Sequence, residues 1–452
     1  MTGLKMTSAV RSVASRGGGM RAALKATAIL AARAVLVACT GGPPPADPED
    51  DLTADLERDL RSFLEVADTN DRVRAVLVQH RGEPVLEWYP SASADDYWDV
   101  ESIGKSVMST LLGIAIEQGH LDGVDQTLAE LVPDYAADMT PDVAAVTLRE
   151  LLSHTAGFAA DGPVDQEPVF NSPDWVRFVL ADPLPDAPVE ESFAYSSAAA
   201  HLMSPILVES TGQTVLEYAR DNLFAPLDIA TEPAAEPVVT VVNGQFDPVV
   251  LAAYYAADFA WPTDPQGYHT GGGSLKLRPK DLIQLGQLYL DHGRRGDEEV
   301  VPATWIAQLT SPHVEVVNRH PVAHAYGLMW WLTRYDGDAA YEALGGGGQR
   351  LTVIPARDLV VAVASELDLR DPTAWGAAPS DIALHEMIDT YIAPRAHAHP
   401  LRAGPARPRG RERRHRARAA GSSHGAGAVR RRRGPRPHRI LTHPTGRQCR
   451  RP

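Results

Sequence analysis

Strand-like patterns lie towards both ends of this chain, and helix-like patterns lie between them. Residues 72–89 (RVRAVLVQHRGEPVLEWY) predict a hairpin that turns at Arg81–Pro84. Helices are predicted over Asp51–Val66 and 380–392. Further strands are predicted over Tyr326–Leu332, Tyr341–Leu344, Arg350–Pro355 and Asp358–Ser365. We therefore predict an α+β fold, an α/β sandwich whose antiparallel sheet is built from both chain ends and encloses an inserted all-helical domain.

Charge is distributed unevenly along the 452 residues. Residues 1–39 carry six basic residues and no acidic residue, whereas residues 395–452 carry 18 arginines and one glutamate. The part between them, 40–394, holds 19 basic and 57 acidic residues. Because such an acidic body repels a phosphate backbone, we predict that nucleic acid is not its partner. The sequence contains no run of 18 or more apolar residues, so no membrane-spanning helix is predicted.

The two termini differ from the body and suggest four segments. Residues 1–39 resemble a lipoprotein export signal, because a basic start and a small-apolar stretch end in Leu36-Val37-Ala38-Cys39. A linker (40–54), one folded domain (55–394) and an Arg/Pro-rich tail expected to be disordered (395–452) follow. The protein is thus predicted to be exported, either anchored to a membrane through lipidated Cys39 or secreted. A cytoplasmic protein with a disordered N-terminal arm is the alternative.

The tetrad Ser102-Ile103-Gly104-Lys105 begins a long apolar segment, 103–118, that reads as a buried helix ending near Gly119. The chain has five lysines against 38 arginines, and a desolvated lysine can lose its proton where an arginine cannot. Side chains at i and i+3 lie on one helix face, so Lys105 can reach the Ser102 hydroxyl. Two interpretations stand: a serine nucleophile with its base, or an N-cap followed by a surface lysine.

Five segments in order decide between them, because together they resemble one known family. The segments are Ser102–Ser106, 147–157 (TLRELLSHTAG), Phe193–Ser197, Gly271–Gly273 with the following SLKLRPKDLIQLGQLYL, and Leu344–Gln349. They resemble the serine β-lactamase and penicillin-binding-protein superfamily over about residues 55–392. The resemblance is to the class C-related branch, which includes esterases, D-amino-acid peptidases and 6-aminohexanoate-dimer hydrolases.

The resemblance implies a set of catalytic roles. Ser102 would be the nucleophile, Lys105 its base, and Tyr195 the group that shares the proton with the lysine and passes it to the leaving group. The oxyanion hole would consist of the backbone N–H groups of Ser102 and Gln349. Acyl transfer of this type needs no cofactor.

Two departures from the family pattern bear on the substrate. Ser197 stands where β-lactamases have asparagine, and Gly346 stands where they have a lysine that grips a carboxylate. With Gly347 and Gly348, these positions are expected to line the substrate cleft. Losing a charge-assisted hydrogen bond of about 1.5–3 kcal/mol disfavours carboxylate-bearing substrates. We therefore expect weak or no β-lactamase activity, and a small-molecule ester or amide without an obligatory carboxylate as the substrate.

Alternative functions remain on the same fold. They are a D-alanyl-D-alanine carboxypeptidase or weak β-lactamase, and a catalytically silent binding module; the survival of Ser102, Lys105 and Tyr195 favours the enzyme. His154 is expected to be structural, and His201 and His269 are not in metal-ligand spacings, so no metal site is predicted.

Aromatic residues supply the last sequence expectations. Tyr254, Tyr255, Trp261 and Tyr268 are predicted either to line the cleft or to pack within loops. The pair Trp330-Trp331 is predicted to belong to the core.

Overall fold

A computed structural model describes residues 48–66, 72–161, 167–181, 184, 193–242, 245–317, 319–368, 370 and 379–398. The expected export signal, Cys39 and all but the first four residues of the expected tail lie outside these residues. Everything below concerns the described part of the folded body. No helix in that part has both the length and the apolar character needed to cross a membrane.

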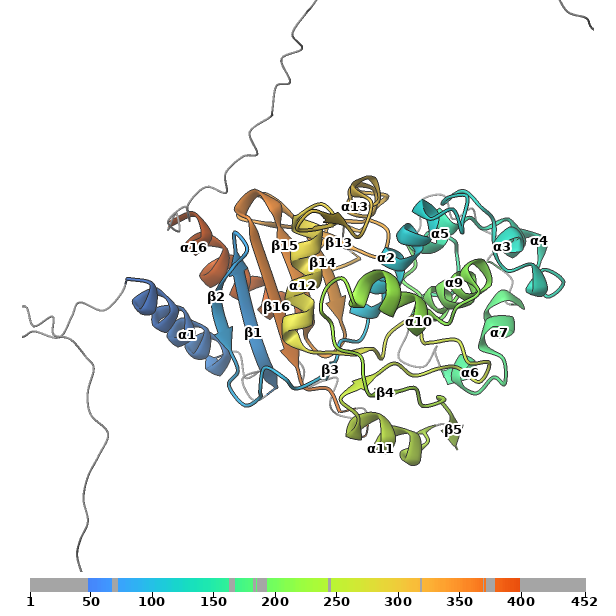
Figure 1. The fold of residues 1–452 in the computed structure, drawn as a ribbon, viewed down its shortest axis with the longest axis horizontal. Coiled ribbons are helices and arrows are strands. Elements are labelled where there is room, and N and C mark those ends of the chain that lie inside the picture. The colour runs from blue at the N-terminus through green and yellow to red at the C-terminus, as the bar shows by residue number, and fades with distance from the viewer. Residues whose placement is uncertain are drawn as a thin grey trace, which may run out of the picture. The chain divides into compact units, whose positions relative to one another are not determined.

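One antiparallel sheet, drawn from both ends of the body, dominates the fold (Figure 1). Its strand order is β11-β12-β13-β14-β15-β16-β1-β2, so the N-terminal hairpin adds to the edge of the C-terminal meander. The strands are β11 (Val314–Glu315), β12 (Ala325–Tyr326), β13 (Trp331–Tyr335), β14 (Asp338–Gly345), β15 (Gln349–Ile354), β16 (Leu359–Ser365), β1 (Val73–His80) and β2 (Glu83–Trp88). The predicted sheet is confirmed; residues 327–330, predicted as strand, instead form the connection between β12 and β13.

Alternation along the strands gives each face of the sheet its own core. Val76 and Val78 pack in the cluster that contains residues of α1 (Pro48–Val66), α15 (Asp381–Met387) and η4 (Ile388–Ile392). Ala75 and Leu77 pack in the larger cluster with residues of α2 (Ile103–Glu117) and α12 (Pro279–Leu290). Period-two side-chain alternation therefore yields a helix–sheet–helix sandwich, as Figure 1 shows. α1 begins at Pro48, inside the segment expected to be a linker.

The insertion between β2 and β11 is mainly helical and also contains short strand pairs. Besides α2 and α12, its helical elements are α3 (Leu128–Leu131), η1 (Pro133–Tyr135), α4 (Pro141–Ala145), α5 (Leu148–Leu152), α6 (Glu167–Phe170), α7 (Trp175–Ala181), α8 (Ser197–His201), α9 (Met203–Thr211), α10 (Val215–Ala219), η2 (Arg220–Phe224), α11 (Pro248–Ala256) and α13 (Ala303–Leu309). The pairs are β3 (Trp98–Asp99) with β8 (Lys276–Leu277), β4 (Ala234–Ala235) with β7 (Phe259–Ala260), β5 (Val241–Val242) with β6 (Gln245–Phe246), and β9 (Arg294–Arg295) with β10 (Glu298–Glu299).

Helix α2 joins the two halves of the molecule. It is buried from Ile103 to Ala115, as its nearly uninterrupted apolar sequence predicts. A Cβ at Gly113 would lie 2.1 Å from the Trp305 ring, so the glycine allows α13 to pack closely against it. The backbone turns left-handed at Gly119, directly after the C-cap Gln118. The helix thus holds residue 102 between the sheet and the helical insertion.

Candidate active site

Ser102 and Lys105 lie together at the first turn of α2. The Lys105 side chain is 1% exposed, so the interpretation as a surface lysine is excluded. Its Nζ donates to Ser102 Oγ over 2.8 Å, to Ser197 Oγ over 2.9 Å and to the Gly272 carbonyl over 2.5 Å. Ser102 is the N-cap residue, yet its hydroxyl makes no capping hydrogen bond. The serine hydroxyl is therefore committed to the lysine rather than to the helix end.

The surroundings of Lys105 favour its neutral form. Burial lowers the pKa of Lys105 to about 8, against the charges of Asp161 and Glu101, which raise it. No direct carboxylate contact to the ammonium is found among the described residues, and all three hydrogen-bond partners named above are neutral oxygens. Near pH 8 about half of such amines are unprotonated and can accept a proton.

Ser197, the first residue of α8, is fixed by Asp161. Its backbone N–H donates to Asp161 Oδ1 over 2.7 Å, and its hydroxyl donates to Oδ2 over 2.6 Å. The Asp161 backbone N–H in turn donates to the Tyr195 carbonyl over 2.7 Å. Because Ser197 Oγ also accepts from Lys105, the carboxylate acts on the lysine through one hydroxyl.

Tyr195 stands beside the same ammonium. Lys105 Nζ lies 4.9 Å from the centre of the Tyr195 ring. Burial raises the pKa of the Tyr195 phenol well above its ordinary value, although a hydrogen bond with Ser102 opposes the shift. The phenol thus stays protonated and can donate to an oxygen or nitrogen near Ser102.

The glycine segment after β14 approaches the residues that precede Ser102. A Cβ at Gly345 would lie 2.3 Å from the Val100 carbonyl oxygen, so this contact requires glycine. Gly347 and Gly348 have φ values of 77° and 87°, which favour glycine in the turn to β15. Gln349 is 1% exposed, and its side-chain amide donates to the Ser365 carbonyl over 2.6 Å.

A cavity of about 930 Å³ opens onto this cluster. The predicted residues Ser102, Tyr195 and Ser197 line it, as do Gly346, Gly347 and Gly348; Gln349 is not among its lining residues. The remaining lining residues are Glu101, Asp161, Val169, Phe170, Trp175, Ala198, His201, Thr270, Gly272, Gly273, Ser274, His320, Pro321, Trp331, Leu344, Gly345, Pro379, Ser380, Asp381 and Ile382. A small organic substrate can therefore reach the Ser102 hydroxyl.

Glu101, immediately before Ser102, is a buried acid with an unusual backbone. Its φ is 50°, a left-handed value that costs a glutamate energy, and its N–H donates to Asp99 Oδ1 over 2.8 Å. Burial and the neighbouring Asp99 raise the pKa of Glu101 well above its ordinary value. The Glu101 side chain therefore contributes to the cavity wall a carboxyl group that holds its proton more tightly than usual.

The histidines predicted to be non-catalytic have structural partners. His154 is 3% exposed, and its Nδ1 accepts the Ser196 N–H over 3.3 Å. His201 lies 3.0 Å from Asp264, and His269 lies 3.0 Å from Glu236. Within the described ranges, no three His, Cys, Asp or Glu side chains group so that they could hold a metal ion.

Aromatic residues divide between the cavity and the core. Trp330 and Trp331 are both buried, as predicted, but Trp331 also lines the cavity and stacks on Tyr195 with ring centres 5.5 Å apart. Tyr254, Tyr255, Trp261 and Tyr268 do not line this cavity. Tyr254 and Tyr255 line a smaller cavity of about 300 Å³, whereas Trp261 is fully buried. None of the four therefore lines the large cavity: Trp261 and Tyr268 pack in or against the core, whereas Tyr254 and Tyr255 belong to α11.

Three acidic residues of the cavity were not predicted from the sequence. Glu101 has a local signal, since it directly precedes the Ser-x-x-Lys tetrad in the sequence. Asp161 and Asp381 have none, because one lies in a loop and the other begins a helix more than 270 residues after Ser102. Only the fold brings them to the serine.

Comparison with known proteins shows which family this chain resembles. A sequence model of the family described as beta-lactamase matches residues 66–380. Penicillin-binding protein 4 of Amycolatopsis lactamdurans is 27% identical over 297 residues, which make up 63% of this chain and 75% of that protein. The 6-aminohexanoate-dimer hydrolase of Paenarthrobacter ureafaciens is 25% identical over 361 residues, 75% of this chain and 84% of its own. Among solved structures, EstCE1, described as a hydrolase with promiscuous acyltransferase activity, has a TM-score of 0.54 at 16% identity and covers 75% of this chain and 99% of its own.

Proposed function

Because the chain belongs to the β-lactamase family, we propose that it is a serine hydrolase that cleaves an ester or amide through an acyl-enzyme on Ser102. The observation that carries the proposal is the 2.8 Å hydrogen bond between Lys105 Nζ and Ser102 Oγ at the edge of the cavity. A nucleophile and a base within hydrogen-bond distance are what acyl transfer to serine requires. A protein similar to this chain over 361 residues hydrolyses an amide dimer by name, which supports this reaction class.

In the proposed acylation, neutral Lys105 removes the proton from the Ser102 hydroxyl as Oγ attacks the substrate carbonyl carbon. The pKa of about 8 places the amine close to working pH, where a general base is most effective. The proton then lies on Lys105, between Ser102 and Ser197. The Asp161 carboxylate, hydrogen-bonded to Ser197, stabilises this transient ammonium.

Tyr195 supplies the proton that the leaving group needs. Its phenol is protonated because burial raises its pKa, and it lies against both Lys105 and Ser102. Donation to the leaving alcohol or amine, followed by recovery of the proton from Lys105, returns both groups to their starting states. Water then attacks the acyl-enzyme, and the same groups act in reverse.

Backbone N–H groups would stabilise the oxyanion. We propose the Ser102 N–H as one donor, as expected from the sequence. For the second donor, the turn Gly346–Gly348 is favoured over Gln349, because the turn lines the cavity and Gln349 does not. Each such donor contributes about 3–4 kcal/mol to transition-state stabilisation in enzymes of this kind.

The test uses the full-length chain with p-nitrophenyl acetate. Nitrophenol release is followed while mass spectrometry of peptides locates any acetyl adduct. We expect a Ser102-peptide adduct that is lost in Ser102→Ala and Lys105→Ala and kept in Lys280→Ala, which removes a partly exposed lysine paired with Asp95. No release and no adduct would refute the hydrolase and leave the binding module on this fold.

A further inference from the structure

The charged residues that line the large cavity are all acidic. Among the described lining residues, Glu101, Asp161 and Asp381 are the only carboxylic acids. The described lining contains no lysine and no arginine. Two of these acids are already balanced. Burial raises the pKa of Glu101, which favours its neutral form, and Asp161 is linked through Ser197 to Lys105.

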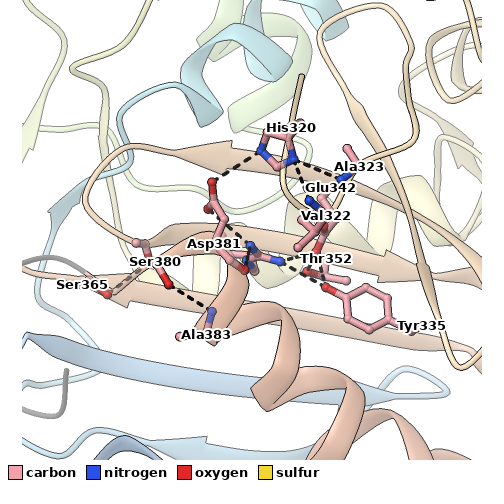
Figure 2. Close-up of polar contacts among 12 residues, drawn as sticks. His320, Val322, Ala323, Tyr335, Glu342, Thr352, Ser365, Ser380, Asp381 and Ala383 are labelled. Atoms are coloured by element: carbon pink, nitrogen blue, oxygen red, sulfur yellow. Dashed lines mark hydrogen bonds and ion pairs between the residues drawn. The ribbon is translucent and has the colours of Figure 1, made fainter. Parts of the chain in front are cut away.

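Asp381 begins α15, lines the cavity and belongs to a network of polar contacts (Figure 2). Its Oδ1 lies 3.4 Å from Arg350 Nη2, and its backbone carbonyl accepts from the same nitrogen over 3.0 Å. Although burial opposes it, the hydrogen bond with His320 and the charge of Arg350 hold the pKa of Asp381 below its ordinary value. Asp381 is thus an anion.

The positive charge of Arg350 is already matched by another carboxylate. Arg350 Nη1 donates to Glu342 Oε1 over 2.9 Å, and neither side chain is exposed at all. Glu342 Oε1 also accepts from the Tyr335 and Thr352 hydroxyls, each over 2.5 Å. One guanidinium between two carboxylates leaves one negative charge, and the carboxylate that reaches the cavity is Asp381.

His320 contacts Asp381 through one of its two ring nitrogens. Its Nδ1 accepts the backbone N–H groups of Val322 and Ala323 over 3.4 and 3.1 Å, so the ring proton sits on Nε2. Nε2 faces Asp381 Oδ2 at 3.5 Å, as Figure 2 shows. The His320 ring therefore orients the Asp381 carboxylate through Nε2.

The anion lies close to the part of the site where family relatives hold a cation. A Cβ at Gly348 would lie 3.0 Å from Pro379 Cδ, so the segment that leads into α15 packs against the glycine turn. His320 stacks on Trp331 with ring centres 4.2 Å apart, and Trp331 stacks on Tyr195. These aromatic faces connect the Asp381 end of the cavity to the Ser102 end, and such faces attract ammonium groups.

We propose that Asp381 is a specificity-determining residue that makes this cavity prefer substrates carrying an ammonium group and reject substrates carrying a carboxylate. The inference rests on the proposed function of the site. The chemical class is an ester or amide whose acyl chain ends in a primary or quaternary ammonium. Position 346 lacks the cation that would bind a carboxylate, and position 381 provides an anion. Both features disfavour a substrate that carries a carboxylate.

The test compares p-nitrophenyl esters that differ only in charge. The cation is 6-(trimethylammonio)hexanoate, the neutral isostere is 7,7-dimethyloctanoate, and the anion is the monoester of heptanedioate. A four-carbon ammonium ester tests how the preference depends on the distance between the ammonium group and the ester. We expect kcat/KM of the wild-type chain to favour the cation over the neutral ester by about tenfold, and the neutral ester over the anion. In Asp381→Asn the cation-to-neutral ratio falls to near one. Asp95→Asn, which removes an 80% exposed carboxylate, keeps the wild-type ratio.

Each outcome decides the proposal. A wild-type ratio at or below one, or a preference that persists in Asp381→Asn, overturns it. Because the ratio is taken within one protein, partial loss of folded Asp381→Asn does not affect it. If no ester is turned over, the proposed function fails. Calorimetric binding of the corresponding methyl amides to Ser102→Ala then decides the inference alone, with the ammonium amide expected to bind about tenfold more tightly than its neutral isostere.

Discussion

Two buried cations, Lys105 at the start of α2 and Arg350 in β15, have opposite surroundings. Neither is exposed by more than 1%. Lys105 contacts two hydroxyls and a carbonyl, and burial lowers its pKa to about 8. Although burial also acts against the charge of Arg350, Glu342 lies at 2.9 Å and raises the pKa of the guanidinium.

The hydrogen-bond partners of the two side chains determine whether a buried cation can act as a base. A carboxylate in direct contact fixes the proton, whereas neutral oxygens with a carboxylate one hydroxyl away leave it mobile. The residue types match these roles, because arginine forms several fixed hydrogen bonds and lysine loses its proton when desolvated. Burial outweighs the charges of Asp161 and Glu101, which raise the pKa of Lys105, and leaves that pKa at about 8.

The largest effect is expected when Lys105 is replaced by arginine. Lys105→Arg keeps the positive charge but removes the proton acceptor, so we expect the acylation rate to fall by about 10²–10⁴-fold. Stopped-flow measurement of the first turnover with p-nitrophenyl acetate gives the rate. Lys280→Arg, at a partly exposed position, is the control and keeps the wild-type rate. A Lys105→Arg protein that is acylated at more than a tenth of that rate contradicts the role of base.

Next in size is the effect of removing the partner of Arg350. Glu342→Gln leaves a buried guanidinium with only Asp381 to balance it, so we expect the free energy of unfolding to fall by about 3 kcal/mol. Urea denaturation measures it. Glu298→Gln, on the exposed β10, is the matched change and alters stability by less than about 0.5 kcal/mol. If both variants are equally stable, Arg350 and Glu342 do not form a structural pair.

A smaller effect is expected from Arg350→Lys, the reverse of the first exchange. An ammonium can keep the Glu342 contact but cannot also hold Tyr335 and Asp381, to which Arg350 donates over 3.2 and 3.0 Å. We expect a loss of about 1–2 kcal/mol in the free energy of unfolding. Arg334→Lys, at an exposed position of β13, serves as the control. Equal stability of the two variants would show that the guanidinium fork is dispensable.

The smallest effect concerns the pH at which Lys105 gains its proton. The Asp161 charge stabilises the ammonium form and thereby raises the pKa of Lys105. Asp161→Asn should therefore shift the rising limb of the acylation rate against pH to lower pH. Asp125→Asn, which removes an 83% exposed carboxylate, should leave the limb in place. A shift of the limb to higher pH would mean that Asp161 does not act on the lysine by its charge.

Local patterns predicted the parts of the fold that depend on neighbouring residues. The β1–β2 hairpin and α2 follow from their alternating and continuous apolar sequences, and the Ser102–Lys105 contact follows from i, i+3 spacing on a helix. Residues 327–330 were predicted as strand because they are apolar, but Met329 has a φ of 64°, which ends the pairing. Apolar character alone does not report a turn that tertiary packing imposes.

Contacts between distant segments could not be predicted in the same way. Asp161 reaches Ser197 across 36 residues, and Asp381 reaches Arg350 across 31. Gln349 illustrates the limit within one motif: its side chain binds Ser365 and the preceding glycines line the cavity, whereas the oxyanion role that the resemblance implies for its backbone N–H stays a prediction. Whether a backbone N–H faces the cavity depends on turn geometry that residue types do not report.

The most direct test of whether neutral Lys105 activates Ser102 is the pH dependence of the acylation burst. The burst of nitrophenol is measured from pH 6 to 10 for the wild-type chain and Lys105→Ala, with the adduct mapped at each pH. We predict a wild-type rate that rises about tenfold per pH unit and levels off above about pH 8, with the adduct on Ser102, and a residual flat rate in Lys105→Ala. A wild-type profile that Lys105→Ala leaves unchanged, or an adduct on another residue, would contradict it.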